Sequence, residues 1–347
     1  MGVALAVALV GLAAFKPAAR EVKRLGWVVA LFLVLVVYLA IVSDINGADW
    51  EQRLLRVVII FALAYVVAQG RYHMPSAMFG LGFAAVGNAA AFYAGLTTNN
   101  YPPFLTGFWG DKNVAGLWYA VVLAAGFVTL RRWYSKVMWL AGFGVLLFLT
   151  GSRTSIAAAV LALAWGALRG RVGVFGRWLL VLLGIGALIL VEERYARIGV
   201  FADREGTDWF RELVTLAMAE KADVAPWYGM GLTSSIVRLP GGRWAYFHDS
   251  YLALRVEGGY LLVGFFLVLF VVMGLGLFSR KINVSPETLM FEAAVVVILV
   301  CAWKLGEVFF TSIAAIAIGA LLGAKYGVPL SGPEDSEAIP SRGDRAL

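Results

Sequence analysis

Cysteine and histidine are scarce in this chain of 347 residues. Its one cysteine, Cys301, lies in an apolar run, so it cannot form an intramolecular disulfide, and thiolate metal clusters are excluded. The two histidines, His73 and His248, fall in different predicted loops. A multi-histidine metal site is therefore excluded, and any metal ion would need carboxylate ligands. We expect neither a metal nor a cofactor.

Polar sequence is also scarce. Hydrophobic residues make up 61% of the chain, whereas a soluble domain has about 45–50%. This composition predicts an integral membrane protein, and 12 Trp and 13 Tyr suit a protein with many bilayer interfaces. The net charge of +7 does not indicate a nucleic-acid partner, because the basic residues occur in short clusters between apolar runs.

Eleven apolar runs are candidate spans, since a transmembrane helix needs about 20 residues, with a range of about 17–25. They lie near residues 2–15, 26–43, 56–70, 74–95, 114–130, 136–150, 155–168, 175–191, 259–278, 288–304 and 308–325. Several are short, so the count is 10–12. We predict an all-α polytopic membrane protein with about 11 transmembrane helices in one domain, residues 1–325, followed by a disordered cytoplasmic tail, residues 326–347.

Lysine and arginine residues cluster in every second connection between apolar runs, near residues 16–24, 71, 131–136, 169–177 and 280–281. Cytoplasmic loops carry such clusters. We therefore expect a multi-pass protein of the cytoplasmic (inner) membrane with its N-terminus outside. The segments 44–55, 96–113, 151–154, 192–258 and 304–307 then lie on the extracytoplasmic side.

Residues 192–258 form the only long polar stretch between spans, and we expect this loop to contain short helices. It holds ten acidic residues and seven arginines but one lysine, Lys221. Planar guanidinium groups suit geometric recognition of an anion. Alternatively, most of these arginines are solvated or paired with loop acids. Within the loop, the apolar spacing predicts an amphipathic helix from Thr207 to Lys221.

Arg153 stands in a connection of very few residues, 149–155, with the sequence Leu-Thr-Gly-Ser-Arg-Thr-Ser. A guanidinium at this depth can form two hydrogen bonds to a phosphate. The alternative is an interfacial arginine that reaches lipid phosphates or caps a helix end.

His248 lies just before the ninth run, and a histidine there can act as a general base. Asp249 or Glu257 would orient it, and the alternative is a purely structural histidine. Two weaker patterns are an interfacial pair, Lys304 with Glu307, and the sequence Asp-Lys-Asn at 111–113, which can be a helix N-cap and nothing more.

These segments together resemble the O-antigen ligase and O-antigen polymerase superfamily, over roughly residues 74–325. Thr-Gly-Ser-Arg-Thr at 150–154 resembles its Thr-x-Ser-Arg-small motif, and Pro-Trp-Tyr-Gly-Met-Gly at 226–231 resembles its Pro-x-x-Gly-x-Gly turn. His-Asp-Ser-Tyr-Leu at 248–252 with Glu-Gly-Gly at 257–259 resembles its His-Asn-x-Tyr-Leu…Glu-x-Gly entry into a span. Gly-Asp-Lys-Asn at 110–113 resembles a weaker motif. The chain departs from the pattern at Asp249, where Asn is common, and before Arg211, where Trp-Phe replaces Ser-Gly.

The resemblance implies a metal-independent glycosyltransferase that moves a glycan from a polyprenyl-diphosphate carrier to the hydroxyl group of an acceptor glycan or glycolipid. It implies that arginines bind the diphosphate and that His248 acts on the acceptor. The expected catalytic residues are His248, Arg153 and Arg211. The expected substrate-binding residues are Arg197, Arg204, Arg243, Lys112, Asn113, Asp249, Tyr251 and Glu257. A repeat-unit polymerase of the same superfamily is the alternative, and a polytopic transporter or flippase is the alternative of another class.

Overall fold

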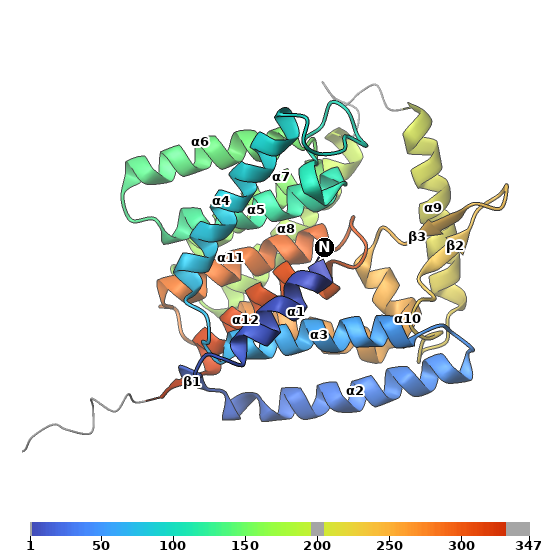
Figure 1. Ribbon diagram of the computed structural model, residues 1–347, viewed down its shortest axis with the longest axis horizontal. Coiled ribbons are helices and arrows are strands. Elements are labelled where there is room, and N and C mark those ends of the chain that lie inside the picture. The colour runs from blue at the N-terminus through green and yellow to red at the C-terminus, as the bar shows by residue number, and fades with distance from the viewer. Residues whose placement is uncertain (1, 196–204, 331–347) are drawn as a thin grey trace, which may run out of the picture.

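The computed structural model describes residues 2–195 and 205–330, which are largely helical (Figure 1). Their twelve α-helices are α1 (Gly2–Ala13), α2 (Gly26–Ile45), α3 (Glu51–Ala68), α4 (Met74–Tyr93), α5 (Lys112–Thr129), α6 (Trp133–Leu149), α7 (Arg153–Leu168), α8 (Val174–Tyr195), α9 (Glu205–Val224), α10 (Ser250–Phe266), α11 (Pro286–Cys301) and α12 (Ser312–Tyr326). A π-helix, η4 (Leu267–Gly274), continues α10, and 3₁₀-helices form η1 (Lys23–Leu25), η2 (Gly107–Trp109) and η5 (Val308–Phe310). Strand β1 (Arg20–Glu21) pairs with β4 (Val328–Pro329), and β2 (Ile236–Arg238) pairs with β3 (Trp244–Tyr246).

Each of the eleven apolar runs coincides with a helix, and the predicted amphipathic loop helix is α9. The helices long and apolar enough to cross a membrane within the described segments are Lys23–Ile45, Met74–Tyr93, Lys112–Thr129 and Ser250–Gly274. Shorter apolar helices accompany them, among them α6, α7 and α12. The chain is therefore an all-α protein with the features of a membrane protein.

Small residues let the central helices approach closely, as is typical of helix packing in membranes. A Cβ atom on Gly116 of α5 would lie 2.6 Å from the Ser155 hydroxyl oxygen of α7. On α12, a Cβ on Gly319 or Gly323 would lie 2.3 or 2.4 Å from the backbone oxygen of Ala64 or Ala68 in α3. Helices α5, α7 and α11 form the buried centre, while α2 and α6 lie on opposite outer sides (Figure 1).

The basic connections meet at one end of the bundle. Arg71 donates to the backbone oxygens of Ala13 and Lys16. Arg20 Nη2 lies 2.8 Å from Glu287 Oε2 at the start of α11. Strand β4 also lies at this end, so the first residues of the segment that we expected to be disordered are paired with β1, and residues 331–347 lie outside the described part.

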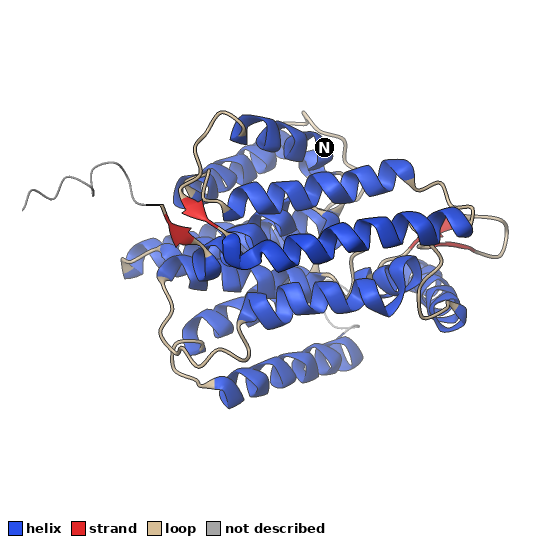
Figure 2. Ribbon diagram, turned by 90° about the horizontal axis from the view of Figure 1, so that it is seen from below, coloured by secondary structure: helices blue, strands red, loops and turns tan. Residues whose placement is uncertain are grey.

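The predicted extracytoplasmic connections meet at the opposite end. Leu105 N donates to Leu149 O at 2.9 Å, and Leu232 N donates to Ser43 Oγ at 2.8 Å. Helix α9 and the β2–β3 hairpin cover this end, and the hairpin projects beyond the ends of α2 and α3 (Figures 1 and 2). The alternation of connections inferred from charge therefore agrees with the fold.

Candidate functional site

Helix α10 is interrupted where it enters the bundle. Gly258 has φ −128° and ψ 15°, and Gly259 has φ 66° and ψ −163°. An interruption leaves backbone groups without helical partners, and these must be paired inside an apolar environment. The loop 226–231 supplies the partners, through Met230 N to Val256 O at 2.7 Å, Gly231 N to Glu257 O at 3.0 Å and Tyr260 N to Trp227 O at 2.9 Å. The sequence motifs 226–231 and 257–259 thus form one interlocked unit.

Glycine is required at the centre of this unit, because the two backbones touch. A Cβ atom on Gly259 would lie 2.0 Å from Trp227 O, and one on Gly229 would lie 2.6 Å from Gly259 N. Both glycines also have positive φ angles, 66° and 88°. The Tyr38 hydroxyl donates to Tyr228 O at 2.5 Å and ties α2 to the same loop.

A buried ion pair ties the interrupted helix to α3. Arg53 Nε and Nη2 donate to Glu257 Oε2 at 3.0 and 2.9 Å, and Arg53 Nη1 donates to Glu307 Oε1 at 2.5 Å. The Ser235 hydroxyl donates to Glu257 Oε1 at 2.5 Å. Glu257 is fully buried. We expected Glu257 to bind substrate or to orient His248, but its carboxylate is enclosed and held by Arg53 and Ser235, so it serves to join three segments.

The connection between α11 and α12 holds the segment that carries His248. Ser250 N donates to Ala302 O at 2.8 Å, and Ser250 Oγ donates to Leu305 O at 2.6 Å. Gly306 packs so tightly against this segment that a Cβ atom there would lie 2.1 Å from Phe247 O. Glu307, the next residue, has a left-handed backbone with φ 60° and is held by Arg53 and Arg56. The carboxylate of Glu307, which we had considered as a partner of Lys304, thus forms ion pairs with two arginines of α3.

His248 is exposed in the short bend between β3, which ends at Tyr246, and α10, which begins at Ser250. Phe247, which precedes it, is buried, and its backbone N donates to Ser235 O at 3.1 Å. The Ser235 side chain also bonds Glu257, so the backbone beside His248 belongs to the same network as the Arg53 ion pair. The position of His248 is thus defined by buried contacts, while its imidazole remains accessible to a substrate.

Asp249 and Tyr251 have structural contacts. Asp249 Oδ1 accepts hydrogen bonds from Tyr251 N and Leu252 N at 2.8 and 2.9 Å, so it is the N-cap of α10. Burial raises the pKa of this carboxyl group above its usual value, against the lowering effect of its two backbone bonds and of Lys304. The Tyr251 hydroxyl donates to Leu299 O at 2.8 Å. Asp249 thus caps the first turn of α10, and Tyr251 anchors that turn to α11.

Arg153 and Lys112 begin two adjacent helices at the same end, since a Cβ atom on Gly116 of α5 would lie within 3 Å of Ser152 and Ser155. Arg153 begins α7 and is half-buried, and Lys112 begins α5 and is buried. The Phe104 ring packs between Lys112 and the connection that precedes Arg153, because Lys112 Nζ lies 4.4 Å from its centroid and a Cβ on Gly151 would lie 2.3 Å from its edge. Asp111 caps α5 by accepting from Asn113 N at 2.7 Å, which confirms the N-cap reading of residues 111–113.

The end of α11 contacts both the segment that carries Arg153 and the segment that carries His248. Cys301 Sγ lies 3.8 Å from Ser155 Oγ, two residues beyond Arg153. The next residue, Ala302, accepts the bond from Ser250, two residues beyond His248. Arg153 and His248 therefore each lie two residues from a contact with the C-terminal end of α11, although 95 positions separate them in the sequence.

The remaining predicted arginines are placed less fully. Arg197 and Arg204 lie outside the described residues, and Arg211 lies within α9, although its side chain is outside the description. Arg243 is exposed in the turn of the β2–β3 hairpin, where its backbone oxygen accepts from Leu239 N at 2.8 Å. In the described ranges, no group of three or more histidine, cysteine, aspartate or glutamate side chains forms a metal-ligand set.

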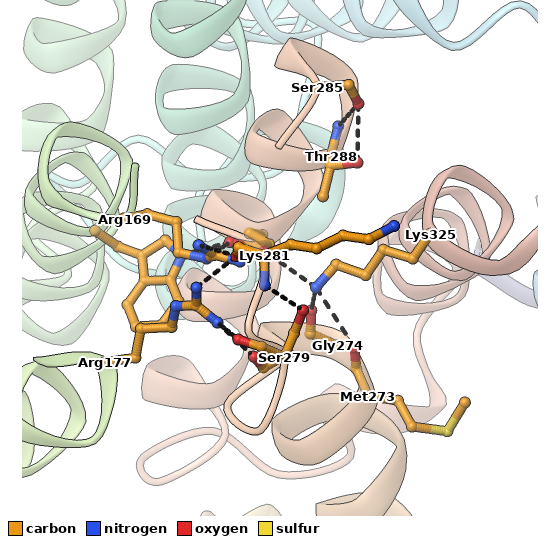
Figure 3. Close-up of polar contacts among 12 residues, drawn as sticks. Arg169, Arg177, Met273, Gly274, Ser279, Lys281, Ser285, Thr288 and Lys325 are labelled. Carbon is orange, nitrogen blue, oxygen red and sulfur yellow. Dashed lines mark hydrogen bonds and ion pairs between the residues drawn. The ribbon is translucent and has the colours of Figure 1, made fainter. Parts of the chain in front are cut away.

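Two charged groups were missed by the sequence analysis. Arg53 precedes an apolar run, and its position in the first turn of a span was the available signal. The second group lies at the basic end, where Glu292 Oε2 is 3.0 Å from Arg169 Nε and Glu292 Oε1 is 2.7 Å from Lys325 Nζ. Arg177 donates to Ser279 O and Lys281 O, both at 2.6 Å. Figure 3 shows Arg169, Arg177 and Lys325 converging on the segment that ends η4.

These basic side chains compensate the carbonyl groups left free where the helix formed by α10 and η4 ends. Arg169 Nη1 donates to Ile282 O at 3.2 Å, Arg177 Nη1 to Gly276 O at 2.9 Å and Lys325 Nζ to Met273 O at 3.5 Å. The group is therefore a helix-capping cluster at the end opposite His248.

Comparison with known proteins gives no relative: no family model, no curated protein and no solved structure matches this chain.

Proposed function

We propose that this protein is a membrane glycosyltransferase that moves a glycan from a polyprenyl-diphosphate carrier to an acceptor hydroxyl group. One observation carries the proposal. The motif residues Arg153, Lys112 and His248 lie at the starts of α7 and α5 and just before α10, at the same end of the bundle, where α7 and α10 both contact the end of α11. Two cations and an exposed base at one end suit a reaction that expels a diphosphate and removes a proton.

In the proposed reaction, the acceptor oxygen attacks the anomeric carbon of the glycan. The bond between that carbon and the diphosphate oxygen breaks, and its electron pair leaves with the diphosphate. His248 accepts the proton of the acceptor hydroxyl group. Arg153 and Lys112 stabilise the negative charge that develops on the leaving oxygen. Arg197, Arg204, Arg211 and Arg243 are proposed to extend the anion site from the loop.

The structural residues of the site have supporting roles in this proposal. Asp249 and Tyr251 fix the first turn of α10, Asn113 belongs to the capped first turn of α5, and Glu257 joins α10 to α3. The protein is proposed to lie in the cytoplasmic membrane with about 11 spans and with this end outside, because the basic connections meet at the other end.

The test is glycan transfer by the purified protein in vesicles that contain lipid-linked glycan. Arg153→Ala and His248→Ala are expected to lower kcat by at least about 100-fold, the usual range for loss of a catalytic base or a charge-stabilising group. His73→Ala and Arg131→Ala are matched controls at the basic end and should retain activity. Full activity of both site variants contradicts the assignment. Transfer is expected to persist in EDTA.

Product analysis separates the two reactions that the motifs share. A single glycosylated acceptor indicates a ligase, and a ladder of products without added acceptor indicates a repeat-unit polymerase.

The interruption of α10 favours one second candidate, a transporter or flippase, because discontinuous spans are typical of transporters. This candidate predicts that labelled lipid-linked glycan crosses the vesicle membrane without any new glycosidic bond. Glycan transfer with no crossing of the carrier supports the transferase instead.

A further inference from the structure

Two large aromatic side chains lie exposed in a row that leads to His248. Trp244 and Tyr246 belong to β3 and are 64% and 71% exposed, whereas Ala245 and Phe247 between and after them are buried. The alternation continues to His248, which is exposed again. Alternate residues of a strand share a face and are about 7 Å apart. One face of β3 therefore presents an indole and a phenol, and the exposed His248 follows two residues beyond the end of the strand.

The fold of the hairpin determines which side chains lie on this face. Val237 and Ala245 are paired across the two strands, and both belong to an apolar cluster with Val214 and Met218 of α9. Burial of that face leaves the other exposed, and a shift of one residue in register would reverse the two faces. The row of exposed rings is thus a consequence of the packing of the hairpin on α9.

Arg238 completes the row. It is the cross-strand partner of Trp244, and its Cζ lies 5.8 Å from the Trp244 ring centroid. It is exposed, so its guanidinium can stack on the indole and still offer donors to a ligand. Tryptophan, tyrosine and arginine are the side chains most enriched at the centres of binding surfaces.

We propose that Arg238, Trp244, Tyr246 and His248 form a binding platform for the glycan chain of a substrate, with the reacting end at His248. A pyranose ring has an apolar face of C–H bonds and a rim of hydroxyl groups. Aromatic rings with a polar group, flanked by a guanidinium, match both features. The platform rests on the proposed function in one respect, which is that His248 marks the reacting end.

The position of the hairpin distinguishes this platform from a membrane anchor. The hairpin extends past the ends of the neighbouring helices, away from the bundle (Figures 1 and 2). Its turn carries the exposed Arg243. The aromatic side chains expected at a bilayer surface are instead those beside the interruption of α10, Trp227 and Tyr260, which are both 63% exposed.

The experiment measures binding of a soluble glycan to the detergent-purified full chain by calorimetry. The probe is the glycan released by mild acid from the lipid-linked pool of the cells that make this protein. Trp244→Ala and Tyr246→Ala are each expected to weaken binding about tenfold, with a rise in KM and little change in kcat. Trp244→Phe keeps an aromatic ring and should bind within about twofold of the parent protein. Trp133→Ala, which removes an exposed indole at the basic end, is the control.

The outcomes separate the platform from the reaction. Weaker glycan binding in both alanine variants supports the platform. If the parent protein also shows no transfer activity, the platform is still supported, but the proposed function is refuted. Transfer that requires His248 but is unchanged by Trp244→Ala and Tyr246→Ala overturns the platform alone. Failure of the probe to bind the parent protein also overturns it. A membrane anchor would give a different result. Both alanine variants would bind the glycan normally, and brominated lipids would quench tryptophan fluorescence less in Trp244→Ala than in Trp133→Ala.

Discussion

Gly259 offers the sharpest test of the interlocked unit, since an added methyl group there meets backbone atoms. In Gly259→Ala, the Cβ atom would lie 2.0 Å from Trp227 O and 2.6 Å from Tyr228 C. These atoms cannot move aside as a flexible side chain can, because Trp227 O also accepts the bond from Tyr260 N at 2.9 Å. The substitution must therefore separate the loop 226–231 from α10 or distort both.

Two terms contribute to the expected loss of stability. Gly259 has φ 66° and ψ −163°, a backbone conformation adopted almost only by glycine, which costs a residue with a side chain about 1–3 kcal/mol. Overpacking of a close contact costs about 1–3 kcal/mol. We expect a loss of about 3 kcal/mol in the free energy of unfolding. With an unfolding entropy of about 2 cal/mol/K per residue, that loss lowers the Tm by about 4 °C.

The single cysteine provides the assay. Cys301 is buried, so a thiol-reactive dye that fluoresces on coupling reports the exposure of one position on heating. Gly264→Ala is the matched control, because it lies in the same helix and its Cβ would have no neighbour within 4 Å. Alanine there should leave the midpoint unchanged or raise it slightly. Equal midpoints for the two variants would refute the steric reasoning.

Three other substitutions test the charged groups by thermal unfolding. Arg53→Gln leaves a buried carboxylate without its partner and should cost about 3–5 kcal/mol, whereas the exposed Arg56→Gln should cost less than about 1 kcal/mol; similar losses would contradict the buried network. Glu292→Gln should cost about 3–5 kcal/mol, against less than about 1 kcal/mol for the partly exposed Glu287→Gln, and the reverse order would exclude the capping cluster. Asp249→Asn keeps the cap but removes a carboxyl group whose pKa is raised in the folded state. In the parent protein, the folded state holds the Asp249 proton more tightly than the unfolded state does. The stability that Asp249 contributes is therefore lost as pH rises from about 4 through its raised pKa. The Asn variant should match the parent near pH 4 and be more stable at pH 7; a parallel pH dependence of the two proteins would count against this.

The sequence by itself determined where the helices lie. Spans must pair their backbone groups internally and present apolar side chains over a nearly constant length. Apolar runs therefore predicted every long helix except α9, which its amphipathic spacing predicted. The alternation of basic connections likewise assigned each connection to one of two ends, and Asp111 was recognised as an N-cap because that bond is local.

Only the tertiary structure decided which groups meet at those ends. Arg53 and Glu257 are separated by 204 positions, and no local pattern relates them. Ser235 belongs to the long polar stretch, yet it is buried against Glu257. The alternation of Trp244, Tyr246 and His248 became meaningful only when α9 covered the opposite face of the hairpin. The periodicity of apolar residues along the chain shows which face of a segment is buried. Which other segment covers that face depends on packing between distant parts of the chain.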